Sequence, residues 1–405
     1  MITYEECKCM SELNCIDDMF SGYKVFSYDY ILVGAGLFNA ALAACLHDKN
    51  PSAKILVIEK RSTIGGNCFT ENIDGIDVHK YGAHIFHTSD KHIWEFVNRF
   101  SEFNSYRHNC MAKSNGKIYN LPFNMNTFCQ LWRNISTPNE AKSVISNEIK
   151  EYFKDINHCP ENLEEKAISL VGKTIYENFI KGYTEKQWGK ICSELSPDII
   201  SRIPVRYTFD NNYFFDDYQG IPVSGYTKMI QRMFDYACAV IVVDRAFDET
   251  HLAKLFSNPY YKNAKIVYTG PIDEFCNYSF GPLEWRSLKF KTKTFKTDNY
   301  QGAAVVNYTD SSVAFTRKIE HKWFNPKSNA KNTIVTTEYP ENWSIGKEPY
   351  YSVNNKETSA LYSKYIDYIK EKYNDFIIFA GRLGQYRYFD MDDTIEEAIK
   401  LAARI

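Results

Sequence analysis

A glycine-rich turn near the N-terminus carries the residues best suited to chemistry. The segment GAGLFN, residues 34–39, follows the pattern G-x-G-x-x-G except at its last position, where Asn39 replaces the third glycine. Gly34 and Gly36 permit a tight turn that brings backbone N–H groups close to a pyrophosphate. The third glycine normally allows a helix to pack closely on a strand, so Asn39 must point aside or bind locally. Alone, the motif is weak.

Glu59 strengthens the motif, because it ends the next apolar run, where an acidic side chain can accept a hydrogen bond from a ribose hydroxyl. It opens the segment EKRSTIGGN, residues 59–67, which contains a second glycine pair. A second backbone loop of this kind suits the longer body of a flavin dinucleotide, whereas a nicotinamide cofactor does not require it. The segment therefore favours FAD, with an exposed glycine turn as the alternative interpretation.

Two histidines, His84 and His87, lie in GAHIFHT, residues 82–88. On a helix their spacing could serve a metal, but no HExxH pattern or obvious carboxylate partner accompanies them, so no metal site is predicted. A histidine in an apolar stretch is most often a hydrogen-bonded core residue. Close to a flavin, a neutral imidazole could instead orient a substrate or tune the ring. His87 is the stronger candidate.

Arginines and tyrosines recur in four short aromatic-rich stretches, at residues 201–214, 315–321, 348–353 and 380–393. A diphosphate favours guanidinium forks and phenolic donors. Any single arginine would be interpreted as a surface residue, but four such clusters in a nearly neutral chain indicate a diphosphate site. The segment YTEKQWG, residues 183–189, adds aromatic rings that either pack between helices or hold flat ligands.

The elements that must position these residues alternate as in a dinucleotide-binding fold. Residues 31–33 and 54–59 are apolar runs typical of buried parallel strands, and an Ala- and Leu-rich helix is expected over 37–47 between them. The runs at 265–270 and 375–382 also reach a glycine, like strands of the same sheet.

The middle of the chain has a different pattern. Charged and apolar residues recur at helical spacing from about 126 to 190, which predicts a helical domain. β-Branched and aromatic residues dominate 202–215 and 283–337, which predicts antiparallel strands. A final helix is expected over 393–403, capped by the aspartate at 392 or 393.

The expected fold class is α/β, with a discontinuous Rossmann-like FAD-binding domain, an inserted helical bundle and an antiparallel β-sheet domain. The predicted boundaries are an N-terminal extension at 1–27, an FAD-binding domain at 28–100, 220–280 and 355–405, a helical domain with a mobile substrate lid at 124–200, and a sheet domain at 101–123, 201–219 and 281–354.

Composition narrows the function classes. The chain has 405 residues and a formal net charge of −2, which argues against nucleic-acid and membrane-surface partners, because these require a basic excess. No apolar run approaches the roughly 18 residues of a membrane span, and the N-terminus has no signal-peptide pattern, so a cytoplasmic protein is expected. Cys7, Cys9 and Cys15 match no common zinc spacing and are interpreted as free thiols.

Together the motifs resemble one family, the bacterial type of UDP-galactopyranose mutase. The matching stretches run in the family's order from about Tyr28 to the C-terminus, and residues 1–27 lie outside the resemblance. They are GAGLFNAAL, EKRSTIGGN, HKYGAHIFHT, NLPFNMNTF, KGYTEKQWG, RIPVRYTFDNNYF, QGIPVSGYTKMI, TGPIDEF, YTDSSVAFTR, EYPENW, EPYYSV and GRLGQYRYFDMD.

The resemblance implies a homodimeric isomerase that interconverts UDP-galactopyranose and UDP-galactofuranose. Reduced FAD would form a covalent adduct through N5 with the anomeric carbon, without net redox change. Two rival functions share the flavin motifs. One is an FAD-dependent oxidase of the amine-oxidase type, and the other is a non-catalytic nucleotide-sugar-binding flavoprotein.

The family's site residues carry over onto matching positions of this sequence. The implied catalytic residues are His87, Arg202, Arg317, Tyr388 and Asp390. The implied substrate-binding residues are Phe179, Tyr183, Thr184, Trp188, Arg202, Tyr213, Arg317, Tyr351 and Tyr388. The implied cofactor-binding residues are Gly34, Gly36, Leu37, Phe38, Glu59, Lys60, Gly66, Asn67, His84, Arg382 and Met391.

Within this set, Arg202 and Arg317 would clamp the diphosphate, and Phe179 with Tyr183 would form a uracil platform. Trp188 and Arg202 resemble the family's mobile lid, which would leave Lys186 and Gln187 on the exposed side of that segment. The start of the last helix would face the flavin pyrimidine, where a helix N-terminus favours the anionic reduced form.

Three positions depart from the family's pattern. Asn39 stands in the fingerprint, Phe315 replaces the usual Tyr before Thr316 and Arg317, and Ser352 replaces the usual Pro after Tyr351. None of the three removes a residue that the chemistry requires.

Overall fold

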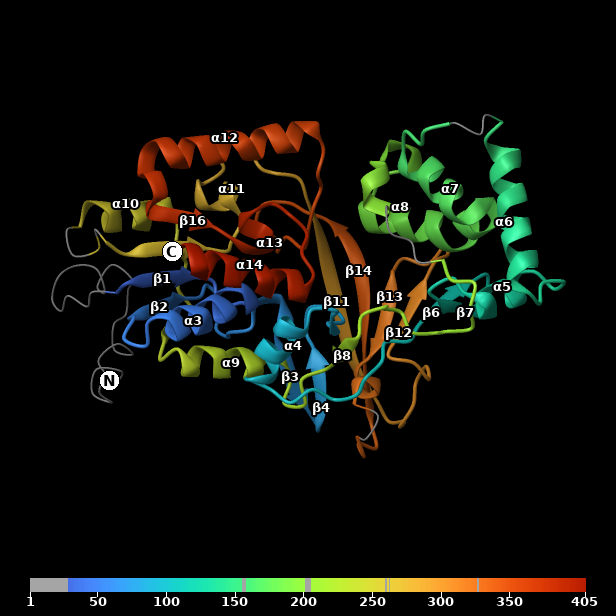
Figure 1. The fold of residues 1–405 in the computed structure, drawn as a ribbon, viewed down its shortest axis with the longest axis horizontal. Helices are drawn as coiled ribbons and strands as arrows, with labels where there is room; N and C mark the ends of the chain where they lie inside the picture. Colours follow the sequence, from blue (N-terminus) through green and yellow to red (C-terminus); the bar gives the residue numbers. More distant parts are fainter. Residues whose placement is uncertain (1–27, 155–157, 201–204, 259–260, 262, 326–327) are drawn as a thin grey trace.

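A five-stranded parallel sheet lies in the middle of the larger lobe, between helices on either side (Figure 1). The computed structural model describes residues 28–154, 158–200, 205–258, 261, 263–325 and 328–405. The sheet has the order β16-β10-β1-β2-β9, and every neighbouring pair is parallel. Its strands are β1 (Tyr30–Val33), β2 (Ile55–Ile58), β9 (Val240–Val242), β10 (Lys265–Tyr268) and β16 (Ile377–Phe379). The predicted βαβ unit and both later strands are confirmed.

Helices cover both faces of this sheet, which explains why its strands are apolar throughout. Leu32 and Val57 point into one core, while Ile31 and Val33 point into the other, as the period of two in a strand requires. The first face packs against α3 (Leu37–Lys49), α9 (Tyr226–Tyr236) and α14 (Met391–Arg404). The second packs against α10 (Glu249–Ser257), α11 (Ile272–Phe275) and α12 (Lys356–Tyr373).

A seven-stranded sheet stands beside this lobe, with the order β15-β11-β14-β13-β12-β6-β7. Its strands are β6 (Cys110–Ser114), β7 (Lys117–Leu121), β11 (Trp285–Phe295), β12 (Val305–Tyr308), β13 (Arg317–Glu320), β14 (Thr333–Asn342) and β15 (Tyr351–Ser352). The prediction of strands over 283–337 is confirmed. The sheet is mixed rather than antiparallel, because β12 pairs in parallel with β6, a distant strand to which no hairpin joins it.

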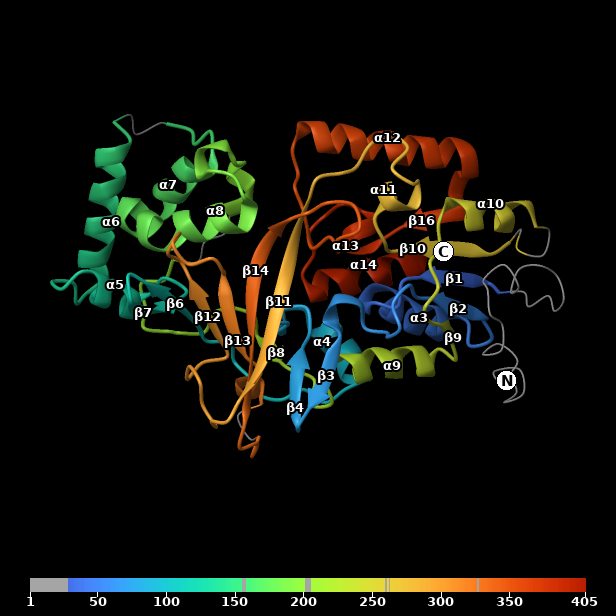
Figure 2. The same cartoon turned by 180° about the vertical axis from the view of Figure 1, so that it is seen from behind.

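A helical bundle lies at the far end of the seven-stranded sheet (Figure 2). Asn124, Thr137 and Asn162 cap the starts of its first three helices with their side chains. The predicted helical region is confirmed. The bundle contains α5 (Met125–Leu131), α6 (Pro138–Tyr152), α7 (Leu163–Ile175), a π-helical turn η2 (Tyr176–Lys181) and α8 (Gly182–Trp188).

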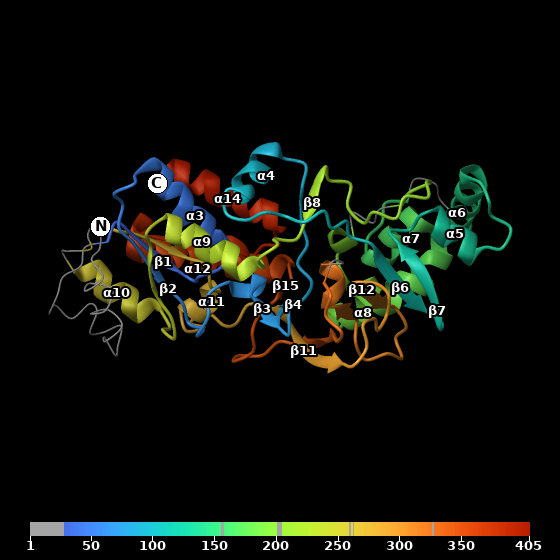
Figure 3. The same ribbon diagram turned by 90° about the horizontal axis from the view of Figure 1, so that it is seen from below.

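Smaller elements complete the described chain, and the view from below shows the parallel-sheet lobe at one end of the molecule and the helical bundle at the other (Figure 3). Among the described residues, no helix is long and apolar enough to cross a membrane. The smaller elements are η1 (Gly66–Cys68), β3 (Thr70–Ile73), β4 (Ile76–His79), β5 (Phe86–Thr88), α4 (Lys91–Asn98), η3 (Cys192–Glu194), η4 (Pro197–Ile200), β8 (Tyr218–Gly220), η6 (His321–Phe324), η7 (Asn374–Phe376) and α13 (Gly381–Gly384).

The strand prediction over 202–215 is wrong where the structure describes it, at 205–215. That segment makes only one isolated bridge, between Val205 and Phe123. Hydrogen bonds of side chains hold this segment in place, rather than the backbone hydrogen bonds of a β-ladder. Arg206 donates to the backbone oxygens of the two residues before Phe214, and the side-chain oxygen of Asn211 accepts from three asparagine amides.

The last helix begins two residues earlier than expected. Its first helical residue is Met391, and Asp390 is the N-cap, so the prediction of Asp392 or Asp393 in that role is wrong. Asp393 accepts instead from the backbone N–H of Asp390 at 3.2 Å, as the third residue of a capping box does. The earlier start brings the helix terminus up to Tyr388.

Asn39 binds locally, as the fingerprint required. Its buried side chain donates to the carbonyl oxygens of Val33, at 3.0 Å, and Gly34, at 2.8 Å. The amide therefore joins α3 to the end of β1 where a third glycine would have allowed direct packing.

We expect Asn39→Ala to lower the free energy of unfolding by about 1–3 kcal/mol, because it leaves two strand-end carbonyls without this donor. Urea unfolding followed by circular dichroism measures the change. Asn98→Ala is the matched control, since Asn98 is exposed on α4 and donates only to Trp94. Equal losses in the two variants would contradict this role for Asn39.

Candidate active site

An elongated cavity of about 370 Å³ opens at the carboxyl ends of β1, β2 and β10. Ligands of open parallel sheets bind at this edge. All of the predicted cofactor-binding residues line the cavity, although they come from five separate stretches of the chain. They are Gly34, Gly36, Leu37, Phe38, Glu59, Lys60, Gly66, Asn67, His84, Arg382 and Met391.

Glycines shape the phosphate end of this cavity. Gly34 has φ +99°, and a Cβ there would lie 2.3 Å from the hydroxyl of Thr269. A Cβ on Gly66 would lie 3.0 Å from the Cα of Gly36, so the two glycine loops face each other at close range. Helix α3 begins just beyond Gly36 without a side-chain cap, which leaves its first N–H groups available. These features fit the diphosphate of a dinucleotide.

Glu59 lies at the end of β2, 5% exposed. Its carboxylate accepts from the backbone N–H of Ala35 at 2.7 Å and of Arg61 at 2.8 Å. These bonds fix the carboxylate while each oxygen keeps a further lone pair for a ribose hydroxyl.

Several cavity residues were not found from the sequence. Arg61 forms an ion pair with Glu348 at 3.0 Å. Arg245 and Phe247, which follow β9 in the chain, also line the cavity. The short apolar run of β9 could have identified Arg245 and Phe247, because residues that follow a parallel strand lie at the same edge of the sheet as the cavity. Glu348 has no such signal, since its place depends on the other sheet.

Arg317 lies beyond the cavity, on β13 directly opposite Glu338 of β14. Its Nε donates to the buried carboxylate of Glu338 at 2.7 Å, which leaves the terminal nitrogens for other acceptors. Burial disfavours the charge of Arg317, but Glu338, Tyr183 and Tyr351 together outweigh burial and hold the pKa of Arg317 above its ordinary value. The guanidinium is therefore a fixed cation at neutral pH.

Tyrosines gather around this cation. Burial raises the pKa of Tyr213 to about 12 and also raises the pKa of Tyr183 and of Tyr351, and all three feel the charge of Arg317. Their hydroxyls thus remain protonated donors at neutral pH. Three distant stretches of the chain contribute these phenols to one place, and Tyr213 and Tyr351 belong to the Arg/Tyr clusters of the sequence.

Arg382 connects this group to the cofactor cavity, which it lines. Its guanidinium stacks on Tyr388, 4.6 Å from the ring centroid, and it donates to the carbonyl of Tyr350. The rings of Tyr351 and Tyr388 stack with centroids 6.5 Å apart. The structure therefore brings together the arginine and both tyrosines that the sequence assigned to this site.

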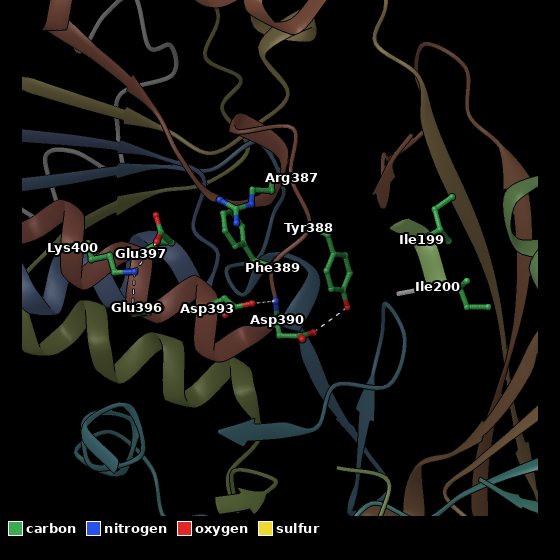
Figure 4. Close-up of a pocket in the computed structure, with 10 residues that line it drawn as sticks. All are labelled: Ile199, Ile200, Arg387, Tyr388, Phe389, Asp390, Asp393, Glu396, Glu397 and Lys400. Atoms are coloured by element: carbon green, nitrogen blue, oxygen red, sulfur yellow. Dashed lines mark hydrogen bonds and ion pairs between the residues drawn. The ribbon is translucent and has the colours of Figure 1, made fainter. Parts of the chain in front are cut away.

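A second cavity of about 600 Å³ lies in front of Tyr388, between the helical bundle and α14 (Figure 4). Tyr388 donates to the carboxylate of Asp390 at 3.1 Å on one side, while Ile199 and Ile200 of η4 lie across the gap. This space is large enough to admit a nucleotide sugar beside the cofactor cavity.

The two predicted histidines lie in different environments. Burial lowers the pKa of His84 to about 4, so its ring is neutral, and its Nδ1 donates to the carbonyl of Gly82 at 2.9 Å. His87 lies on β5 rather than on a helix, and its Nδ1 bonds to Asp216 at 2.9 Å. Among the described residues, no three His, Cys, Asp or Glu side chains form a metal-binding group.

The helical bundle contributes the remaining predicted residues. Phe179 and Thr184 are 5% and 7% exposed, and Phe179 packs on Tyr119 and Phe123 as a core residue does. Trp188 is partly buried at the end of α8. Arg202 lies outside the described residues.

Lys186 is not on an exposed side of its segment, which corrects the expectation from the sequence. Its ammonium is half-buried and donates to three backbone carbonyls of the β12–β13 connection. The side-chain oxygen of Gln187 is also buried, and it lacks a hydrogen-bond partner among the described residues.

Comparisons with known proteins agree with this geometry. A model of the UDP-galactopyranose mutase family matches residues 178–388, and a model of NAD(P)-binding Rossmann-like domains matches residues 32–100. The chain is 36% identical to the dTDP-fucopyranose mutase of Escherichia coli over 374 residues, which are 92% of this chain and 97% of that protein. It is 37% identical to a probable UDP-galactopyranose mutase of Klebsiella pneumoniae, covering 92% and 93% of the two chains.

Solved structures show the same fold at low identity. A crystal structure of reduced UDP-galactopyranose mutase superposes with a TM-score of 0.71 at 13% identity, over 94% of each chain. A putative protoporphyrinogen oxidase from Exiguobacterium reaches a TM-score of 0.61 at 12% identity, covering 94% of this chain and 99% of its own. The fold alone therefore does not separate mutases from oxidases.

A parallel sheet with a glycine-lined cavity at its carboxyl edge, joined to a second sheet and a helical bundle, defines a flavin-binding protein of the Rossmann-like class. Within that class, the chain belongs to the UDP-galactopyranose mutase family. It is a pyranose–furanose mutase that acts on a nucleotide sugar.

The buried histidines predict how acid affects stability. Burial lowers the pKa of His321 to about 3 and of His84 to about 4, below the ordinary value of about 6.5. Below about pH 6.5 the unfolded chain takes up protons that the folded protein does not, so stability falls as the pH falls towards these values.

Replacing His321 should reduce this dependence. We expect His321→Gln to lower the slope of unfolding free energy against pH, between about pH 6 and about pH 4.5, by about 1.4 kcal/mol per pH unit. Urea unfolding at several pH values measures the slope. His92→Gln is the control, because His92 is exposed. An unchanged slope for His321→Gln would contradict burial of the neutral ring.

Proposed function

We propose that the protein interconverts UDP-galactopyranose and UDP-galactofuranose with reduced FAD and without net redox change. The observation that carries this proposal is the position of Arg317. A partly buried, permanently charged guanidinium with tyrosine donors around it stands next to a cavity built for a dinucleotide. That combination suits a substrate diphosphate placed beside a flavin.

Residues around the glycine-lined cavity would hold FAD along its length. The α3 N-terminus and Gly66 would take the diphosphate, Glu59 a ribose hydroxyl, and the N-terminus of α14 at Met391 the flavin pyrimidine. Reduced FAD in this cavity would supply the nucleophile for the anomeric carbon of the sugar.

The protein's own groups would act on the leaving diphosphate. Arg317 has one nitrogen bonded to Glu338, so its remaining nitrogens would bind phosphate oxygens and stabilise the charge that develops as UDP departs. Tyr351 and Tyr388 would donate their hydroxyls to the same oxygens. Because both phenols stay protonated, they would add no competing negative charge.

His84 would act as a neutral positioning group near the sugar, and His87 would act as a second positioning group. The Nδ1 of His84 is engaged with Gly82, so its Nε2 is left as an acceptor. Asp216 likewise bonds Nδ1 of His87 and fixes the orientation of that ring against Phe214, whose centroid lies 3.7 Å away. A fixed ring would direct Nε2 consistently.

We also propose, from the family resemblance, that the active form is a cytoplasmic homodimer with the discontinuous cofactor domain described above. Light scattering of the purified protein tests the oligomer, and a monomer at micromolar concentration would refute it.

A second candidate substrate is dTDP-fucopyranose, because one well-matched relative is a dTDP-fucopyranose mutase. The two substrates share the diphosphate and differ in the base methyl group, the ribose hydroxyl and the hydroxyl at C6. The Arg317 site would serve either of them, so the choice depends on groups that contact the base and C6.

The deciding experiment incubates the purified flavoprotein with UDP-galactofuranose or dTDP-fucofuranose, with and without dithionite, and separates the products. We expect conversion to UDP-galactopyranose only under reduction, with a larger kcat/KM than for the fucose substrate. A larger kcat/KM for dTDP-fucose would transfer the proposal to the second candidate. Oxygen consumption without any sugar conversion would favour the oxidase.

Arg317→Ala should weaken UDP binding by about tenfold or more and lower kcat/KM by at least as much, since charge-assisted hydrogen bonds are lost. The change is combined with Glu338→Gln, because an unpaired buried carboxylate would itself destabilise the fold. Calorimetric titration with UDP measures the affinity.

Flavin content should stay unchanged in this variant, because Arg317 does not line the cofactor cavity. Arg99→Ala provides the control, since Arg99 pairs with Asp48 on the other lobe. Wild-type UDP affinity in the Arg317 variant would remove this residue from the diphosphate site.

A further inference from the structure

We propose that Lys186 and Arg286 are positioning residues that anchor α8 at the substrate cleft, so that Trp188 lies on a fixed helix rather than on the mobile lid expected for it. The inference rests on the proposed function, since α8 carries Tyr183 and Trp188, which are assigned to the nucleotide sugar. It goes beyond that function by assigning roles to two cations outside the diphosphate site.

Lys186 binds α8 to the β12–β13 connection. Its Nζ donates to the carbonyl oxygens of Tyr308 at 2.8 Å, Asp310 at 2.8 Å and Phe315 at 3.1 Å. An ammonium group has three donors, so all of them are used on one loop. No ion pair of Lys186 occurs in the part of the chain that the structure describes. The last acceptor, Phe315, lies two residues before Arg317, so this anchor ties α8 to the diphosphate site.

Gly182 shows how closely α8 approaches that loop. A Cβ at Gly182 would lie 2.4 Å from the carbonyl oxygen of Thr309 and 3.0 Å from the backbone nitrogen of Ser311. Any larger residue would push the helix off the loop backbone. The contact therefore fixes the distance from which Lys186 reaches its three acceptors.

Arg286 holds the other end of the helix from β11. It is 7% exposed, and its Nε donates to the carbonyl of Gln187 at 2.8 Å. A second nitrogen reaches the carbonyl of Lys186 at 3.4 Å, and a third donates to the side chain of Asn342. The last carbonyls of a helix have no partner within the helix, so Arg286 caps them.

The position of Arg286 connects α8 to another site residue. Arg286 lies directly opposite Tyr351 in the pairing of β11 with β15, and its carbonyl accepts from the N–H of Tyr350. Arg286 therefore fixes the position of Trp188, which follows Gln187, relative to Tyr351 of the diphosphate site. Rotation of α8 away from β11 would break this relation.

Both anchors have an energetic cost. Burial lowers the pKa of Lys186 to about 8, with Asp310 opposing the shift, and burial also lowers the pKa of Arg286. Apolar packing would attach a short helix without desolvating charge. The hydrogen bonds of two cations instead fix the rotation of α8 and its distance from the sheet. This matters because Tyr183 and Trp188 must contact a base and a sugar in a defined orientation.

The test compares Lys186→Met and Arg286→Lys with the wild-type flavoprotein. Lys181→Met is the matched control, because Lys181 is an exposed lysine in the turn before α8. Hydrogen exchange of the backbone N–H groups at 182–189 reports the anchoring directly. Steady-state kinetics report KM and kcat for the substrate that the wild type converts.

We expect faster exchange over 182–189 in both variants, together with a rise in KM of about tenfold and a smaller change in kcat. Flavin content should stay at the wild-type level, and Lys181→Met should match the wild type throughout. If Lys186→Met does not fold, Lys186→Gln and Arg286→Lys carry the same test. Control-like exchange and KM in the variants would overturn the proposal.

The two hypotheses fail in different ways. If the wild type converts neither UDP-galactofuranose nor dTDP-fucofuranose, the proposed function is wrong, while exchange over 182–189 still measures the anchors. If the wild type is active and the variants keep its KM despite faster exchange, the anchors are structural only and the positioning role is refuted.

Discussion

The ion pair between the partly buried Arg317 and the buried Glu338 sets the geometry on which the cleft depends. Glu338 is 0% exposed, so its charge is tolerable only while Arg317 stays beside it. The pair joins β13 to β14, and the guanidinium interacts electrostatically with Tyr183 and Tyr351. A cation held in this way does not need to reorganise when an anion arrives, which is the condition for effective electrostatic stabilisation.

The cofactor cavity is the part of the site that the sequence predicted most completely. Its glycines and Glu59 could be predicted from short sequence patterns. A turn with φ above zero requires glycine, and the acid directly follows an apolar strand. The class of fold followed from the same apolar runs. Arg382 and Met391 required the family resemblance, since no local pattern relates them to the first βαβ unit.

Other features depended on tertiary partners and could not be predicted. Lys186 has the spacing of a surface residue, and only the carbonyls of a loop more than a hundred residues later make it an anchor. Arg286 lies in an ordinary strand. The segment 205–215 has strand-like composition. Its hydrogen bonds, however, run through the side chains of Arg206, which donates to a backbone carbonyl, and of Asn211, which accepts from Asn124. Strand propensity alone does not predict such bonds.

The packing of α14 on α3 has a consequence for biosynthesis. Lys49, at the end of α3, donates to the carbonyl of Ala402, which lies 353 residues later in the chain. Met391 closes one side of the cavity. On the ribosome, the glycine turn and α3 therefore emerge long before the helix that covers them. A nascent chain stopped before residue 391 would therefore lack the side of the cavity that Met391 forms.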